Sequence, residues 1–127
     1  MGFFSNLFSQ QLAGPKLPTF RKLSSDTYAR FTKSSEFAVI LFDAAWDVGG
    51  GKAIRPSLQG IVQTHSNRVQ FAEVDIDEHQ DVPASIRLRQ VPAIAYYRRG
   101  ELVGLIGGQA QDISGHVAAL LAGERVG

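Results

Sequence analysis

The sequence predicts an α/β domain in which a central mixed sheet of four to five strands is flanked by helices on both faces. Phe37 to Phe42 is an unbroken apolar run, which is typical of a central strand covered on both sides. Strand-like and helical segments alternate along the chain, as they do in parallel crossovers. Arg99-Gly100 separates the last two strand-like runs and predicts a terminal hairpin, so the sheet is expected to be mixed.

The other elements follow from local patterns, in order along the chain. Further strands are predicted over residues 19–23, 68–76, 92–98 and 101–106. Helices are predicted over residues 28–33, about 51–65, 83–88 and 112–122. Ser24, Ser25 and Asp26 are candidate caps of the first helix. The apolar side chains expected to face the core from the second and last helices are Ile54, Leu58, Ile61, Val62, Ile113, Val117, Leu120 and Leu121.

The composition excludes several classes of function. A chain of 127 residues with 44% apolar content has the size and core of one ordinary domain. The net charge of +1 argues against nucleic acid or an anionic membrane as the main partner. No stretch approaches the ~20 apolar residues of a transmembrane helix, and no secretory signal is evident, so a cytoplasmic location is expected. The sequence has no cysteine, which excludes a disulfide, a thiolate nucleophile and a cysteine-bound metal.

Residues 1–18 are expected to form an amphipathic segment and a linker ahead of a domain over residues 19–127. One apolar stripe of a short helix would carry Phe3, Phe4, Leu7, Phe8 and Leu12. A helix this short needs something to pack against. Two uses of the stripe stay open: packing on its own domain, or docking on a partner, a second copy or a membrane surface.

The stretch from Val39 to Pro56 combines a buried strand, a glycine-rich loop and the start of a proline-containing helix. It resembles the active-site segment of thioredoxins, where Trp-Cys-Gly-Pro-Cys-Lys stands in this place. The resemblance covers about residues 19–121 and implies the thioredoxin fold. The further segments that carry it, in the family's order, are Lys52–Pro56, Val74–Asp77, Ile86–Pro92, Arg99–Glu101 and Gly107-Gly108.

Both cysteine positions of the family motif are empty. Counting back from Pro56 aligns Val48 with the attacking cysteine and Gly51 with the resolving one. Thiol–disulfide exchange needs a low-pKa thiolate and a second sulfur, which these residues do not offer. The same alignment puts Phe42 where the family has a buried carboxylate, with Asp43 one place later. The resemblance therefore implies a redox-inactive member that is not an enzyme of the thiol–disulfide type.

The other half of the thioredoxin site is kept. Val91-Pro92 resembles the family's cis-proline loop, whose backbone pairs with an extended substrate segment in a short form of strand addition. The resemblance implies an adaptor or a chaperone-like accessory that binds an unidentified protein or peptide; cysteine-less relatives that assist hydrogenase maturation in bacteria are one precedent. The predicted peptide-binding surface consists of Trp46, Asp47, Val48, Gly49, Gly50, Gly51, Val91, Pro92 and Gly107.

Two other functions stay open. The domain would be structural if Phe3, Phe4, Leu7 and Phe8 drive self-association. It would be a non-thiol anion- or glutathione-binding protein if Lys52 and the helix start hold an anion. No cofactor or metal is expected, because His65, His79 and His116 lie on separate elements without ligand spacing. Asp75, Asp77 and Glu78 are interpreted as a solvated turn.

Overall fold

The computed structural model describes residues 21–44, 50–108 and 110–127, and these form a five-stranded sheet in the order β1-β3-β2-β4-β5. The first three strands in this order run parallel, and β4 and β5 are antiparallel to their neighbours. The mixed sheet predicted from the sequence is therefore confirmed. The strands are β1 (Arg21–Lys22), β2 (Phe37–Asp43), β3 (Val69–Asp75), β4 (Ala93–Arg98) and β5 (Glu101–Gly107).

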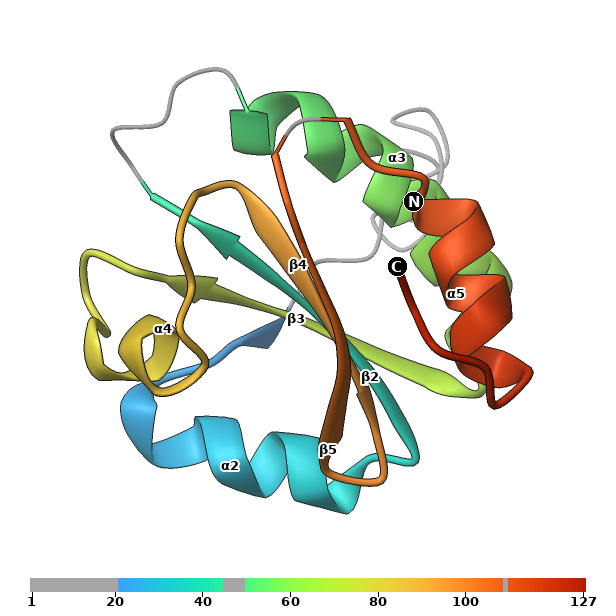
Figure 1. The fold of residues 1–127 in the computed structure, drawn as a ribbon, viewed down its shortest axis with the longest axis horizontal. Coiled ribbons are helices and arrows are strands. Elements are labelled where there is room, and N and C mark those ends of the chain that lie inside the picture. Colours follow the sequence, from blue (N-terminus) through green and yellow to red (C-terminus); the bar gives the residue numbers. More distant parts are fainter. Residues whose placement is uncertain (1–20, 45–49, 109) are drawn as a thin grey trace, which may run out of the picture.

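Helices cover both faces of this sheet, as predicted (Figure 1). Two of them, α2 and α4, lie on one face, and α3 and α5 lie on the other. None of the helices within the described ranges is long and apolar enough to cross a lipid bilayer. The helices are α2 (Ser25–Ser34), α3 (Gly50–His65), α4 (Asp81–Ser85) and α5 (Ile113–Leu121).

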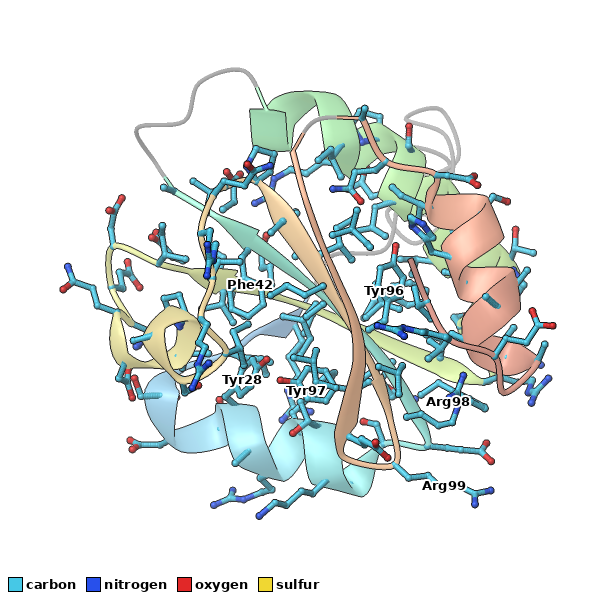
Figure 2. The ribbon with its side chains drawn as sticks, in the orientation of Figure 1. Tyr28, Phe42, Tyr96, Tyr97, Arg98 and Arg99 are labelled. Atoms are coloured by element: carbon cyan, nitrogen blue, oxygen red, sulfur yellow. The ribbon has the colours of Figure 1, made fainter. Side chains whose placement is uncertain are left out.

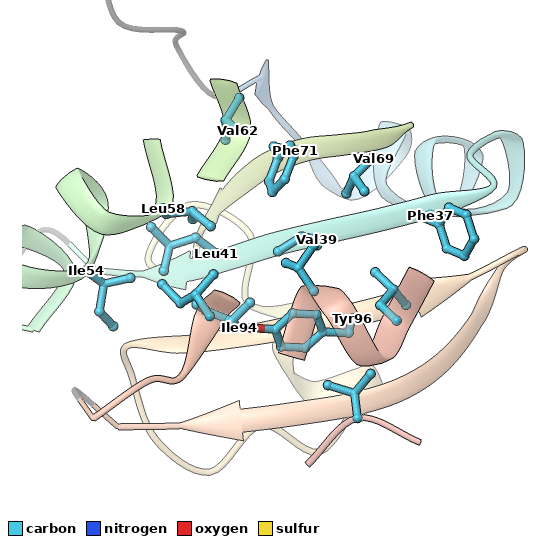
Figure 3. Packing of buried hydrophobic residues seen from close by; sticks show 14 residues of the cluster. Phe37, Val39, Leu41, Ile54, Leu58, Val62, Val69, Phe71, Ile94 and Tyr96 are labelled. Atoms are coloured by element: carbon cyan, nitrogen blue, oxygen red, sulfur yellow. The ribbon is translucent and has the colours of Figure 1, made fainter. Parts of the chain in front are cut away.

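The central strand β2 explains the apolar run in the sequence. Its side chains alternate between two cores: Val39 and Leu41 pack towards α3 and α5, whereas Ile40 and Phe42 pack towards α2 and α4. All four are fully buried. A strand with a core on each side has no solvent-facing residue, and it therefore reads as a continuous apolar segment. Figure 3 shows Val39 and Leu41 among the side chains of the first core.

The hairpin between β4 and β5 has the predicted two-residue turn. Arg99 and Gly100 both have positive φ, at 52° and 84°, as a type I′ turn requires. Arg98 points back to the end of α5 (Figure 2), where its guanidinium donates to the carbonyl oxygens of Leu120 and Glu124 at 2.8 Å each. This arginine therefore ties β4 to the end of α5 and to the segment that follows it.

One predicted helix has wrong boundaries, and another agrees within one residue. The short helix expected over residues 83–88 is α4, which begins at Asp81 and ends at Ser85. It ends early because Arg87 has a φ of 57°, and the amide of Leu88 turns back to the carbonyl of Pro83 at 2.9 Å. The helix predicted from about residue 51 is α3, which begins at Gly50, so two of the three consecutive glycines belong to its first turn. Glycine is therefore tolerated at this helix start.

Candidate functional site

Three of the predicted site residues meet at one edge of the sheet. Gly107 pairs with Ala93 at the start of β4, and the amide of Gly108 donates to the carbonyl of Pro92 at 2.8 Å. The Val91–Pro92 peptide bond is cis. Phe42 pairs with Ala93 from the other side, so the register places Asp43 across from Pro92. The structure thus brings Val91, Pro92 and Gly107 together beside the end of β2.

The remaining predicted site residues belong to the segment between β2 and α3. Trp46, Asp47, Val48 and Gly49 lie outside the described residues. Gly50 and Gly51 open α3, which continues from that segment. Their place in the binding surface stays a prediction.

The backbone before the cis-proline is open for pairing. In the described part of the chain, the amide and carbonyl groups of Arg89, Gln90 and Val91 make no backbone hydrogen bond. Val91 is half-buried, with its side chain against the core under α2 and α4. Peptide groups with unused donors and acceptors pair readily with another extended chain. This segment can therefore accept a short added strand.

Gln90 is a site residue that the sequence did not indicate. Its side chain lies so close to Gly107 that a Cβ atom built on the glycine would stand 2.6 Å from Gln90 Cγ. No larger residue than glycine fits at position 107 unless Gln90 moves. The glycine is thus explained by a close contact between the cis-proline loop and β5. No local pattern carries this contact, because it joins two segments through tertiary packing.

A crevice of about 360 Å³ opens beside this edge, at the carboxyl ends of the parallel strands. It reaches from Lys22 across Asp43 and Asp75, and these two aspartates are paired in the register of β2 and β3. The chain leaves β2 for a helix on one face and leaves β3 for a helix on the other. Such a switch point in an open α/β sheet is where ligands usually bind.

The floor of the crevice holds a buried ion pair that the sequence also did not indicate. Glu73 of β3 is 8% exposed, and its carboxylate forms an ion pair with the guanidinium of Arg55 from α3. Asp43 lies 3.8 Å from the same guanidinium. A carboxylate buried on the core face of a strand needs such a cation. The signal was Glu73 itself, a charge within the apolar segment from Phe71 to Val74.

Removing the cation should destabilise the fold. We expect Arg55→Met to lower the free energy of unfolding by about 2 kcal/mol, since the carboxylate of Glu73 stays buried without its partner. This is less than for a fully buried pair, because the Arg55 side chain is 38% exposed. Urea denaturation at neutral pH measures it. The control is Arg99→Met, which breaks the exposed pair with Glu36; equal losses in the two variants would contradict a structural role for Arg55.

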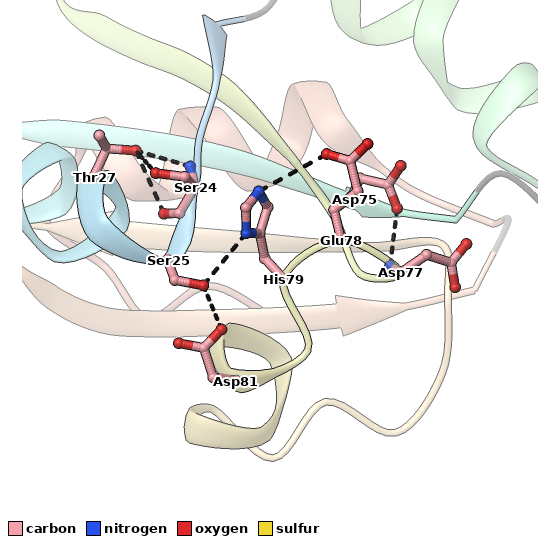
Figure 4. Close-up of polar contacts among 8 residues, drawn as sticks. All are labelled: Ser24, Ser25, Thr27, Asp75, Asp77, Glu78, His79 and Asp81. Carbon is pink, nitrogen blue, oxygen red and sulfur yellow. Dashed lines mark hydrogen bonds and ion pairs between the residues drawn. The ribbon is translucent and has the colours of Figure 1, made fainter.

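A polar cluster ties α2 to the loop before α4 (Figure 4). The hydroxyl of Ser25 donates to the carboxylate of Asp81 and lies 3.3 Å from Nδ1 of His79. This hydrogen bond lowers the pKa of the Asp81 carboxyl below its ordinary value. Nε2 of His79 is 3.9 Å from the carboxylate of Glu78. The two contacts of Ser25 thus link α2 to His79 and to the first residue of α4.

The described residues contain no group of three histidine or acidic side chains that could hold a metal ion. Asp75 and Asp77 belong to a turn in which Oδ1 of Asp75 accepts the amide of Asp77 at 2.9 Å. What the edge offers chemically is a segment of unpaired peptide groups, and a polar crevice beside it.

The comparisons agree with this geometry. A family model described as Thioredoxin matches residues 19–119. Mouse thioredoxin is 36% identical over 77 residues, which cover 61% of this chain and 71% of the mouse protein. Thioredoxin H7 of Arabidopsis thaliana is 35% identical over 79 residues, which cover 62% of this chain and 60% of that protein.

Solved structures agree as well. Mitochondrial thioredoxin 3 of Saccharomyces cerevisiae, in its oxidised form, aligns with a TM-score of 0.67 at 27% identity, covering 82% of this chain and 92% of that one. The thioredoxin of Malassezia sympodialis aligns with a TM-score of 0.70 at 26% identity, covering 82% and 90%. The chain has no cysteine with which to carry out their thiol chemistry. It belongs to the thioredoxin family, as a member that lacks the active-site cysteines.

Proposed function

We propose that this protein is a redox-inactive binding module that holds an extended segment of a partner protein. The partner would bind at residues 89–92 and the neighbouring Gly107, which together form the cis-proline edge. It would act as an adaptor or a chaperone-like accessory and would carry out no thiol–disulfide exchange. The observation that carries the proposal is the unpaired backbone of Arg89, Gln90 and Val91 next to Pro92. A family member without cysteine can retain only the binding half of the thioredoxin site, which is the half that this edge would provide.

The crevice and the ion pair support the same proposal. On the β2 side of the edge, Asp43 lies 3.8 Å from the guanidinium of Arg55, which pairs with Glu73. On its β5 side, Gln90 packs against Gly107. A loop held from two sides keeps its unpaired peptide groups in one orientation, and this preorganisation lowers the entropic cost of binding a peptide.

Selection from a library of random dodecapeptides displayed on phage tests the proposal. We expect the protein to enrich peptides above background, and we expect a labelled sample to shift the amide signals of Val91 and Gly108 when a selected peptide is added. Gly50→Arg adds a long side chain at the start of α3 and should weaken binding at least about tenfold, which is about 1.4 kcal/mol.

Gly60→Arg is the matched control. The same substitution falls on the same helix, and a Cβ atom built on Gly60 meets nothing within 4 Å. This variant should bind like the unsubstituted protein. If no peptide is enriched, or if a selected peptide leaves the amide signals of Val91 and Gly108 unchanged, the edge is not a binding site. If the peptides bind Gly50→Arg equally well, Gly50 lies outside the binding surface.

The N-terminal segment remains a separate prediction. Residues 1–20 lie outside the described part, so self-association through Phe3, Phe4, Leu7 and Phe8 has no structural support here. Comparing the mass in solution of the full chain with that of a chain lacking residues 1–14 separates this role from peptide binding. A change in mass with unchanged peptide binding would assign the two roles to different surfaces.

A further inference from the structure

Two arginines beside the cis-proline edge have no ionic partner. Arg87 and Arg89 are exposed, and neither forms an ion pair with any residue that the structure describes. Several other arginines of the domain are engaged. Arg55 pairs with Glu73, and Arg98 donates to the carbonyls at the end of α5. Arg87 and Arg89 differ from the other exposed arginines in their position, since they lie on the segment that runs into Val91-Pro92.

Partly buried and exposed side chains alternate in this segment, and both arginines are at exposed positions. Ile86, Leu88 and Val91 pack against the core under α2 and α4. Arg87 lies between Ile86 and Leu88, and Arg89 follows Leu88. Both arginines are exposed. Arg89 is three residues before Pro92, so their Cα atoms are at most about 11 Å apart. An extended peptide paired with Val91 would thus pass within reach of the Arg89 side chain.

Arg87 also occupies a backbone conformation that favours glycine. Its φ is 57°, and it closes the end of α4 with its amide donating to the carbonyl of Ala84 at 3.2 Å. At this position after a helix, glycine is usual because a Cβ atom is strained there. The structure gives the arginine no intramolecular contact that would offset this strain.

We propose that Arg87 and Arg89 select a partner segment that carries acidic side chains at one end. This rests on the proposed peptide-binding function and names the chemistry of its partner. Two free guanidinium groups beside unpaired peptide groups bind carboxylates by charge-assisted hydrogen bonds. The selectivity is for one end only, because both arginines precede Val91 in the chain and face only the part of the bound segment that passes them.

The random dodecapeptide library also tests this inference. We expect peptides selected on the unsubstituted protein to have an excess of Asp and Glu at one end and none at the other. Replacing those acidic residues with amides in a synthetic selected peptide should weaken binding about fivefold at low salt, which corresponds to two exposed ion pairs. The difference should fall to less than about twofold at about 0.5 M salt, because exposed charges are screened.

Three variants test whether Arg87 and Arg89 cause the selection of acidic peptides. The double variant Arg87→Gly, Arg89→Gln should still enrich peptides but lose the acidic excess, and Arg30→Gln, which changes an exposed arginine on α2, should keep it. Arg87→Gly alone should weaken binding of the acidic peptide and yet raise the melting temperature by a few degrees, since it relieves the strained backbone. A variant that binds less peptide because its fold is destabilised would have a lower melting temperature, not a higher one.

The outcomes distinguish the two proposals. Peptides that are enriched at the Val91 edge without acidic bias would overturn the selection by arginine and leave the binding function standing. An acidic excess that persists in the double variant would also overturn it. If no peptide is enriched above background, both proposals fail together.

Discussion

Raising the pH above about 10 should unfold this protein cooperatively, and its tyrosines should ionise only as it unfolds. All three tyrosines of the chain, Tyr28, Tyr96 and Tyr97, are less than 10% exposed. Burial raises the pKa of each phenol above its ordinary value. The hydroxyls of Tyr28 and Tyr97 share a hydrogen bond of 2.6 Å across α2 and β4 (Figure 2). A phenolate would have to form in an apolar core, which disfavours it.

The direction and size of this pH effect on the free energy of unfolding follow from proton linkage. The folded-state pKa of each tyrosine lies above the unfolded value of about 10, so the folded state keeps protons that the unfolded chain releases. The stability is therefore complete below pH 10 and is lost as the pH rises. Each tyrosine lowers the free energy of unfolding by about 1.4 kcal/mol per pH unit over the window between its unfolded and folded pKa values. A domain with about 5–15 kcal/mol of stability has little left after a few such losses.

Phenolate absorbance and far-UV circular dichroism, recorded together over an alkaline titration, check this. We expect both signals to change in one coincident transition. In Tyr97→Phe the absorbance change should be two-thirds as large. A gradual rise in absorbance centred near pH 10 with unchanged circular dichroism would show that the phenols are open to solvent, against the buried arrangement.

Leu58→Ala should lower the free energy of unfolding by about 3 kcal/mol. Leu58 is fully buried on the inner face of α3 and belongs to the core that Figure 3 shows, beside Leu41 of β2. Removing most of a buried leucine side chain loses its transfer free energy and leaves a cavity, a cost of about 2–5 kcal/mol. Urea denaturation should show a lower midpoint with an unchanged slope, because the unfolded chain exposes nearly the same surface.

Leu102→Ala is the control, since it makes the same chemical change at the surface. Leu102 of β5 is 36% exposed, so its loss should change stability by about 0.5 kcal/mol or less. Similar losses in both variants would mean that α3 does not pack on the sheet as described. The comparison needs no knowledge of the ligand, so it tests the fold apart from the proposed function.

Much of the fold was predictable because its signals are local. Phe37 to Phe42 reads as a central strand since cores on both faces remove every polar position from it. Arg99-Gly100 reads as a hairpin because two residues with positive φ are what the turn needs. The boundary of α4 was missed for the opposite reason. Arg87 adopts the left-handed conformation that usually marks a glycine, so its side chain gives no sign that the helix has ended.

The sequence by itself determined the family and the loss of thiol chemistry. The order and spacing of motifs along the chain indicate the family. The absence of cysteine excludes thiol chemistry without any need for coordinates. Only the tertiary structure showed that Arg55 pairs with Glu73, that Gln90 packs on Gly107, and that Arg87 and Arg89 are left without partners. These are relations between segments far apart in the sequence. They depend on strand register and on how a helix lies across the sheet, and neither leaves a periodic trace in the residues themselves.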